Sequence, residues 1–109
     1  MKDLAGLMRQ MQKMQADVAR AQEELEAAEV TGESGAGMVR VTLTGKGMAK
    51  AVAIDPSLMA ADEREVLEDL LVAALNDAKQ KADELAQSTL KGAAGGLADM
   101  LPPGFTPPF

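Results

Sequence analysis

The feature that most constrains the fold is an unbroken apolar repeat near the start of the chain. Apolar residues recur from residue 4 to residue 28 with alternating steps of three and four, and we call them the apolar seam: Leu4, Leu7, Met11, Met14, Val18, Ala21, Leu25 and Ala28. This is the period of a helix that packs along one stripe, and no proline interrupts it. The spacing predicts a first helix about 40 Å long.

After residue 29 the apolar period changes from helical to alternating. Residues 30–37 begin with strand formers and pass into glycines, and residues 38–44 alternate as a half-buried strand does. Gly45-Lys46-Gly47 predicts a hairpin turn, because glycine supplies the positive φ of tight turns. Residues 48–54 predict the next strand, and apart from Lys50 both of its faces are apolar enough to be covered.

A second long helix is predicted to follow the strands. Asp55 as N-cap and Pro56 as first helical residue indicate a short turn. Asp62 is expected to cap the long helix, with Glu65 at the spacing of a capping box, and Gly92 to end it. The predicted order of helix, small antiparallel sheet and helix is an α+β fold.

Composition limits the domain organisation and the chemistry. In this chain of 109 residues we expect residues 1–91 to form a single domain and residues 92–109, rich in Gly and Pro, to form a flexible tail. Cysteine and histidine are both absent, which excludes disulfides, thiolate metal sites and the usual nucleophile–base pairs. We therefore expect a protein that is not an enzyme, with no cofactor, no metal and no small-molecule substrate.

The same composition bears on location. A chain without cysteine fits a reducing interior such as the cytoplasm. No segment approaches the roughly 20 apolar residues that span a bilayer, so no membrane partner is expected.

Element lengths suggest a second copy of the chain. A strand of seven residues is about 23 Å long, so the hairpin cannot cover two helices of about 40 Å each. An identical subunit could bury the overhang, since two-fold dimers are the commonest oligomers and the apolar seam could pair with its own copy. The alternative is that the two helices pair within one chain.

A line of cations runs along the first helix. Lys2, Arg9, Lys13 and Arg20, which we call the basic line, fall within an arc of about 40° and extend for about 27 Å. The apolar seam is centred about 140° away, so the basic line should face outward. Although the whole chain carries a net charge of −6, its first twenty residues hold these four cations and two acids, a local charge of +2. Because charges are screened over about 8 Å at physiological salt, this edge can attract phosphates locally.

Several other readings compete with a phosphate-binding surface. Outward positions of an amphipathic helix are often merely solvated. Lys79, Lys81 and Lys91 of the second helix are scattered among acids, whereas the hairpin cations could form a second patch: Arg40, Lys46 and Lys50.

A different class of function is a protein-interaction module that uses the Met-rich helix or the Pro-rich tail.

Aromatic content narrows the kind of nucleic acid. The chain has two aromatic residues, Phe105 and Phe109 in the tail, and these provide no platform on which unpaired bases could stack. Contact with a duplex backbone needs only suitably spaced cations. The sequence therefore favours double-stranded DNA, bound with little sequence preference.

Five segments, in order and at matching spacing, resemble the YbaB/EbfC family of nucleoid-associated proteins. They cover nearly the whole chain: residues 30–37, residues 38–44, Ile54 to Leu58, Leu67 to Leu70 with Asn76 to Ala78, and Leu101 to Phe105. The resemblance implies an α-β-β-β-α protomer in which residues 30–34 become a first strand, and a tweezer-like homodimer with projecting helical arms.

The resemblance also implies a function. It implies binding of double-stranded DNA, association with the nucleoid in the cytoplasm, and effects on gene expression. In the family the DNA-contacting surface is attributed to the two long helices. Carried over by position, that surface comprises Lys2, Arg9, Lys13, Arg20, Lys79, Lys81 and Lys91.

Overall fold

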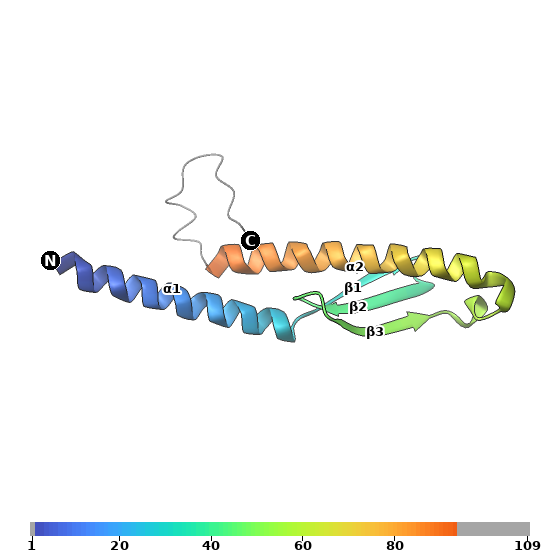
Figure 1. Cartoon of the computed structure of the whole chain (residues 1–109), viewed down its shortest axis with the longest axis horizontal. Helices are drawn as coiled ribbons and strands as arrows, with labels where there is room; N and C mark the ends of the chain where they lie inside the picture. Colours follow the sequence, from blue (N-terminus) through green and yellow to red (C-terminus); the bar gives the residue numbers. More distant parts are fainter. Residues whose placement is uncertain (1, 94–109) are drawn as a thin grey trace, which may run out of the picture.

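The computed structural model describes residues 2–93 and has the predicted α-β-β-β-α order (Figure 1). Its elements are α1 (Lys2–Ala27), β1 (Glu29–Ser34), β2 (Val39–Thr44), β3 (Ala49–Ile54), the short 3-10 helices η1 (Pro56–Leu58) and η2 (Ala61–Glu63), and α2 (Arg64–Ala93). The α+β prediction is confirmed, including the first strand that the family resemblance implied. Of the predicted tail, residues 92 and 93 belong to α2, and residues 94–109 lie outside the described part of the chain.

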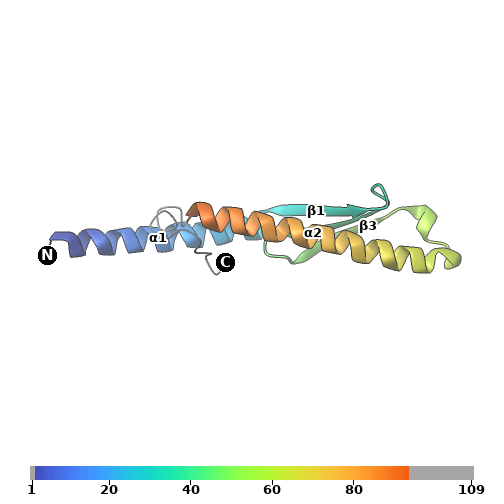
Figure 2. The same cartoon turned by 90° about the horizontal axis from the view of Figure 1, so that it is seen from above.

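The molecule is elongated, with α2 lying along the sheet and α1 projecting as an arm (Figures 1 and 2). Its extents are 73 × 28 × 16 Å and its radius of gyration is 19.8 Å. A compact domain of this length would have a radius of gyration of about 13 Å. Between residues 2 and 93, neither helix is apolar enough over a long enough stretch to cross a membrane.

The three strands form one antiparallel sheet in the order β1-β2-β3. In its register Gly32 of β1 lies opposite Val41 of β2, which in turn lies opposite Val52 of β3. The hairpin prediction is confirmed, since Gly47 has a φ of 89° in the turn between β2 and β3. β1 and β3 are thus the two edge strands.

The core lies between one face of the sheet and α2. Three side chains of β2 are buried there, Val39, Val41 and Leu43. α2 meets them with Ala74 and Ala78, which are fully buried. Because alanine is small, the helix backbone approaches the sheet closely enough that α2 can rest directly on β1 and β2.

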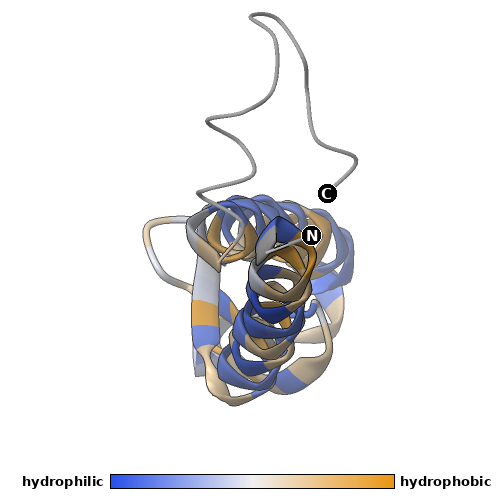
Figure 3. Cartoon of the chain, turned by 90° about the vertical axis from the view of Figure 1, so that its left-hand side faces the viewer, coloured by the Kyte–Doolittle hydropathy of each residue, from blue (hydrophilic) through white to orange (hydrophobic). Residues whose placement is uncertain are grey.

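α1 packs on the rest of the chain only through its C-terminal part. Ala21 and Leu25 are buried, and α2 ends beside this segment. Further toward the N-terminus, Leu7 and Met11 are 54% and 56% exposed. The two long helices therefore do pair within the chain, but the pairing covers only the C-terminal part of the apolar seam. Viewed end-on from the N-terminus, α1 shows both hydrophobic and hydrophilic residues around its circumference (Figure 3).

Two expectations about helix ends were wrong. Asp62 lies inside η2, which begins after Ala60 without a side-chain cap, and α2 starts at Arg64. No cap is needed because Arg64 has αR dihedrals (φ −57°, ψ −46°), so the 3-10 turn passes directly into the α-helix. At the other end the helix continues through Gly92, where nothing requires a left-handed conformation.

The cap at the start of η1 was predicted correctly, whereas the burial of β3 was not. The side chain of Asp55 accepts a hydrogen bond of 2.9 Å from the backbone N–H of Ser57. In β3 every residue is exposed except Ile54, which is half-buried. The reason is that α2 lies over β1 and β2 and leaves the apolar strand β3 uncovered.

Candidate nucleic-acid interface

The basic line lies on a continuous helix, as predicted. Arg9 and Lys13 are exposed one turn apart on the projecting part of α1. No described carboxylate lies within ion-pair distance of either side chain. Lys2 also belongs to α1, and its side chain lies outside the described part of the structure. The helix therefore keeps Arg9 and Lys13 available for an anion.

Arg20 is the least available described cation of the basic line. Its guanidinium lies 3.9 Å from a carboxylate oxygen of Asp17, one turn earlier in α1. The Arg20 side chain is nevertheless 69% exposed, and a long, exposed ion pair of this kind contributes little. A phosphate could displace Asp17 at small cost.

The hairpin cations, considered as a second patch, are each paired with a glutamate. The N···O distances are 3.5 Å for Arg40–Glu33, 3.1 Å for Lys46–Glu26 and 2.9 Å for Lys50–Glu29. These pairs make the hairpin surface locally neutral. They weaken the case for a second phosphate-binding patch.

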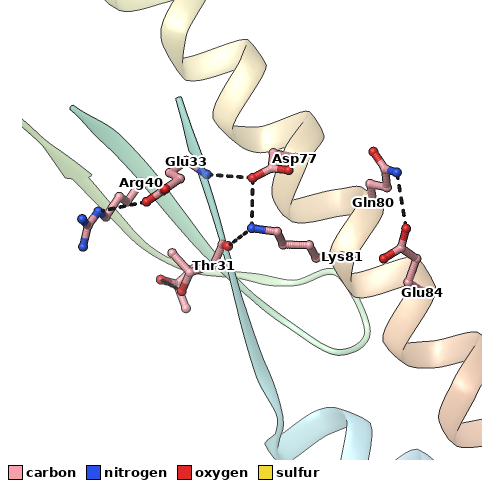
Figure 4. Close-up of polar contacts among 8 residues, drawn as sticks. Thr31, Glu33, Arg40, Asp77, Gln80, Lys81 and Glu84 are labelled. Atoms are coloured by element: carbon pink, nitrogen blue, oxygen red, sulfur yellow. Dashed lines mark hydrogen bonds and ion pairs between the residues drawn. The ribbon is translucent and has the colours of Figure 1, made fainter. Parts of the chain in front are cut away.

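The cations in the middle of α2 are also paired, and one of them contacts the sheet. Lys79 lies 3.7 Å from Asp83. The Lys81 ammonium lies 3.2 Å from Asp77 and donates a 3.0 Å hydrogen bond to the carbonyl of Thr31 in β1 (Figure 4). Lys81 thus joins α2 to the sheet.

Asp77 completes this contact on the same edge of the sheet. Its carboxylate accepts a 3.0 Å hydrogen bond from the backbone N–H of Glu33 (Figure 4). That backbone hydrogen bond, together with the Lys81 side chain, lowers the pKa of Asp77 below its ordinary value of 3.8. Asp77 and Lys81, four residues apart, therefore cover one donor and one acceptor of β1.

Lys91 lies elsewhere on α2. It is exposed in the last turn, and neighbouring residues of that turn, Gly92 and Ala93, line a shallow hollow together with Asp17 and Arg20. No described carboxylate pairs with it. The fold thus brings the last turn of α2 beside Arg20, while Lys79 and Lys81 stay over the sheet.

Sequence reasoning missed the structural use of Asp77 and Lys81. Their spacing of four residues does indicate an ion pair on a helix. Their hydrogen bonds to Thr31 and Glu33 depend on how α2 lies over β1, which no local pattern specifies. The pairing of the hairpin cations with glutamates could not be predicted for the same reason, since 7 to 21 residues separate the two members of each pair along the chain.

Comparison with known proteins agrees with the fold and identifies the family. Residues 1–97 match the family model described as the YbaB/EbfC DNA-binding family. Nucleoid-associated proteins of Maricaulis maris and Methylocella silvestris are 55% and 49% identical to the chain, over the full length of each protein. A crystal structure of an uncharacterized Helicobacter pylori protein superposes with a TM-score of 0.65 at 28% identity, covering 90% of this chain and 96% of that one. Given a family match over most of its length, the chain belongs to the YbaB/EbfC DNA-binding family.

Proposed function

We propose that the chain works as a nucleoid-associated homodimer that binds double-stranded DNA with low sequence specificity through α1. The family supports DNA as the ligand. Relatives named nucleoid-associated proteins support the nucleoid, in the cytoplasm, as its place of action. In this proposal binding changes nucleoid organisation and, through it, gene expression.

The observation that carries the proposal is the contrast between the cations of α1 and those of the body. Arg9 and Lys13 are exposed on the projecting part of α1, with no described carboxylate at ion-pair distance. Every described cation from Arg40 to Lys81 lies against an acid: Arg40, Lys46, Lys50, Arg64, Lys79 and Lys81. A phosphate that approaches the body must compete with these acids, whereas one that approaches the arm meets unpaired cations. We therefore place the DNA contact on the basic line, with Lys91 as an accessory cation.

Low sequence specificity follows from the residue types on this surface. Lys and Arg spaced along one edge of a helix are suited to phosphates, which carry no direct sequence information. Both aromatic residues of the chain lie at positions 105 and 109, away from the basic line in sequence. The proposal therefore involves backbone contacts and no base stacking.

The two edges of the sheet differ in how well they are covered, and this difference supports a homodimer. α2 covers the outer edge of β1 through Asp77 and Lys81, which hydrogen-bond its backbone. At the other edge β3 has no neighbouring strand within the described chain, and Val52 is 52% exposed. An uncovered apolar edge strand invites pairing with another strand.

The side of α2 toward β3 also carries exposed apolar residues that support the same dimer contact. By helical periodicity Leu75 and Val72 lie on the side of α2 away from Asp77, which is the side toward β3. They are 45% and 59% exposed. We propose that two copies pair β3 against β3, bury Leu75 and Val72 in the same contact, and thereby hold two α1 arms in a tweezer-like arrangement.

Dimerisation is tested by sedimentation of the purified chain, whose mass is 11.4 kDa. We expect twice that mass, and a Val52→Asp variant that shifts toward the single-chain mass while α1 keeps its helical signal. A wild-type protein that stays monomeric at micromolar concentration would rule out the dimer.

DNA binding is tested through its salt dependence. Each phosphate contact contributes about 0.9 to the slope of log K against log salt. Replacing Arg9 and Lys13 by Gln should therefore lower the slope by about 3.6, since a dimer loses four cations. The matched control is Arg40→Gln with Lys50→Gln, which removes the same charge from paired positions and should leave the slope nearly unchanged.

Two results would contradict the proposed interface. Equal slopes for wild type and the Arg9/Lys13 variant would remove α1 from the interface. A larger loss in the hairpin control than in the α1 variant would move the interface to the sheet.

A further inference from the structure

The projecting part of α1 carries an apolar strip that no described residue covers. Leu4, Leu7 and Met11 of the apolar seam are 57%, 54% and 56% exposed. A shallow hollow continues the strip toward the body, lined by Met11, Met14, Gln15, Val18, Ala19 and Gln22. Contiguous exposed apolar surface of this kind usually marks a contact with another segment or molecule.

The end of α2 lies where this strip begins. α2 runs antiparallel to α1 (Figure 1). Its last residues, Gly92 and Ala93, line a hollow together with Asp17 and Ala21 of α1. α2 therefore ends beside the last covered turn of the apolar seam, and its axis points toward the N-terminus of α1.

The residues that follow have the length and composition to cover the strip. Residues 94–109 include five large apolar side chains: Leu97, Met100, Leu101, Phe105 and Phe109. From Val18 to Leu4 the strip is about 21 Å long. An extended segment advances about 3.1 Å per residue, so Phe105, twelve residues beyond Ala93, reaches about 37 Å. The whole strip is within reach.

We propose that residues 94–109 pack on the apolar strip of α1 in the same chain, with the phenylalanines against the methionines. Phenylalanine rings and methionine sulfurs make favourable contacts. Prolines at 102, 103, 107 and 108 restrict the segment before it binds, which reduces the entropy lost on ordering. The covalent link favours this occupant over a separate molecule, because a short tether supplies an effective concentration of about millimolar.

A second α1 is a less suitable occupant. Asp3, Gln10 and Asp17 flank the seam along one side of α1. When two such arms pair antiparallel about Gln10, Asp3 of one copy faces Asp17 of the other, and like charges repel there. The strip is also centred about 140° from the basic line, so this inference does not depend on the proposed DNA binding.

The test uses the methionine methyl groups. Phe105 and Phe109 are the chain's two aromatic residues, so any aromatic ring-current shift within the protein must come from them. In methyl-labelled protein we expect the Met11 and Met14 methyl signals to be shifted upfield in wild type and to lose that shift in a Phe105→Leu, Phe109→Leu variant. Met48 and Met59, which are 69% and 67% exposed on the body, serve as internal controls and should not move.

Two further measurements complete the test. Removing residues 94–109 should speed amide exchange in residues 4–14 about tenfold, while β2 amides keep their protection and show that the body is folded. Unmoved Met11 and Met14 signals in the leucine variant, or unchanged exchange on truncation, would overturn the proposal.

A mixing experiment distinguishes the same chain from a second copy. Labelled leucine variant is refolded together with an excess of unlabelled wild type. If the labelled Met11 and Met14 signals stay unshifted, the contact lies within one chain. If they regain the shift, the rings come from another copy, and the same-chain assignment is overturned.

Discussion

Gly32 permits a close approach between the backbones of α2 and β1, and its replacement by alanine tests this packing directly. A Cβ built at Gly32 would lie 2.1 Å from the backbone nitrogen of Ala78 and 2.4 Å from the backbone oxygen of Ala74. Real Cβ atoms do not come within 3.0 Å of such neighbours. Both neighbours are backbone atoms, so no side-chain rotation can relieve the clash. α2 must move away from β1 by about 1 Å.

The loss in the free energy of unfolding follows from the core contacts that this movement of α2 loosens. α2 seals Val39, Val41 and Leu43, all of which are buried, and a shift of α2 loosens every one of these contacts at once. Overpacking costs about 1–3 kcal/mol, and we expect about 3 kcal/mol here because the backbone has to yield. In a domain of this size that lowers the melting temperature by about 12–24 °C.

The assay is urea and thermal unfolding of wild type and Gly32→Ala at one fixed protein concentration, since dimerisation would make stability depend on concentration. Gly6→Ala is the matched control, because nothing lies within 4 Å of a Cβ at Gly6 and alanine favours a helix by about 0.5–1 kcal/mol. The φ of Gly32 is not in the left-handed region, so alanine adds no backbone strain there. A Gly32→Ala protein within about 0.5 kcal/mol of wild type would refute the close packing of α2 on β1.

Two carboxylates give predictions for acid pH. Because the Glu33 backbone N–H and the Lys81 side chain lower the pKa of Asp77, its stabilising effect is complete above the unfolded value and is lost as the pH falls through the lowered value. Asp77→Asn should therefore be less stable than wild type at neutral pH and approach wild type below about pH 4, measured by urea unfolding across pH. The Ser57 backbone N–H likewise lowers the pKa of Asp55. Asp55→Asn should keep the cap and lose only the acid dependence, whereas Asp55→Ala should lose stability at neutral pH, and equal stability of the two variants at pH 7 would contradict the capping role.

The elements with a long, regular period were predictable from the sequence alone. The apolar seam gives α1 to within two residues, and alternation gives β2 and β3 to within one. Local side-chain chemistry also sufficed at Asp55, whose cap needs only the next two residues. These features share one property, which is that their physical cause lies within a few positions of the chain.

The features that the sequence alone did not predict depend on contacts between distant segments. β1 needed the family resemblance because Gly32 resembles a turn residue, although here it admits the helix backbone. The exposure of β3 could not be foreseen, because its composition suits a covered strand and only the lateral position of α2 decides the matter. The availability of a cation was equally hidden, since Lys81 and Arg9 look alike until their neighbours are known.

The distribution of charge between arm and body explains how an acidic protein of this family could hold DNA. The first twenty residues carry +2 and the chain carries −6, so the rest of the chain carries −8. From Asp17, which lies beside the last turn of α2, to the start of α1 the arm projects about 22 Å, which is more than twice the screening length of about 8 Å at physiological salt. A duplex at the N-terminal half of the arm is thus screened from the acids of the body, whereas a duplex laid on the sheet would have to compete with Glu29 and Glu33 for the cations that they pair with, Lys50 and Arg40. In the proposed complex the same acids that lower the net affinity keep DNA away from the body and confine it to the arms.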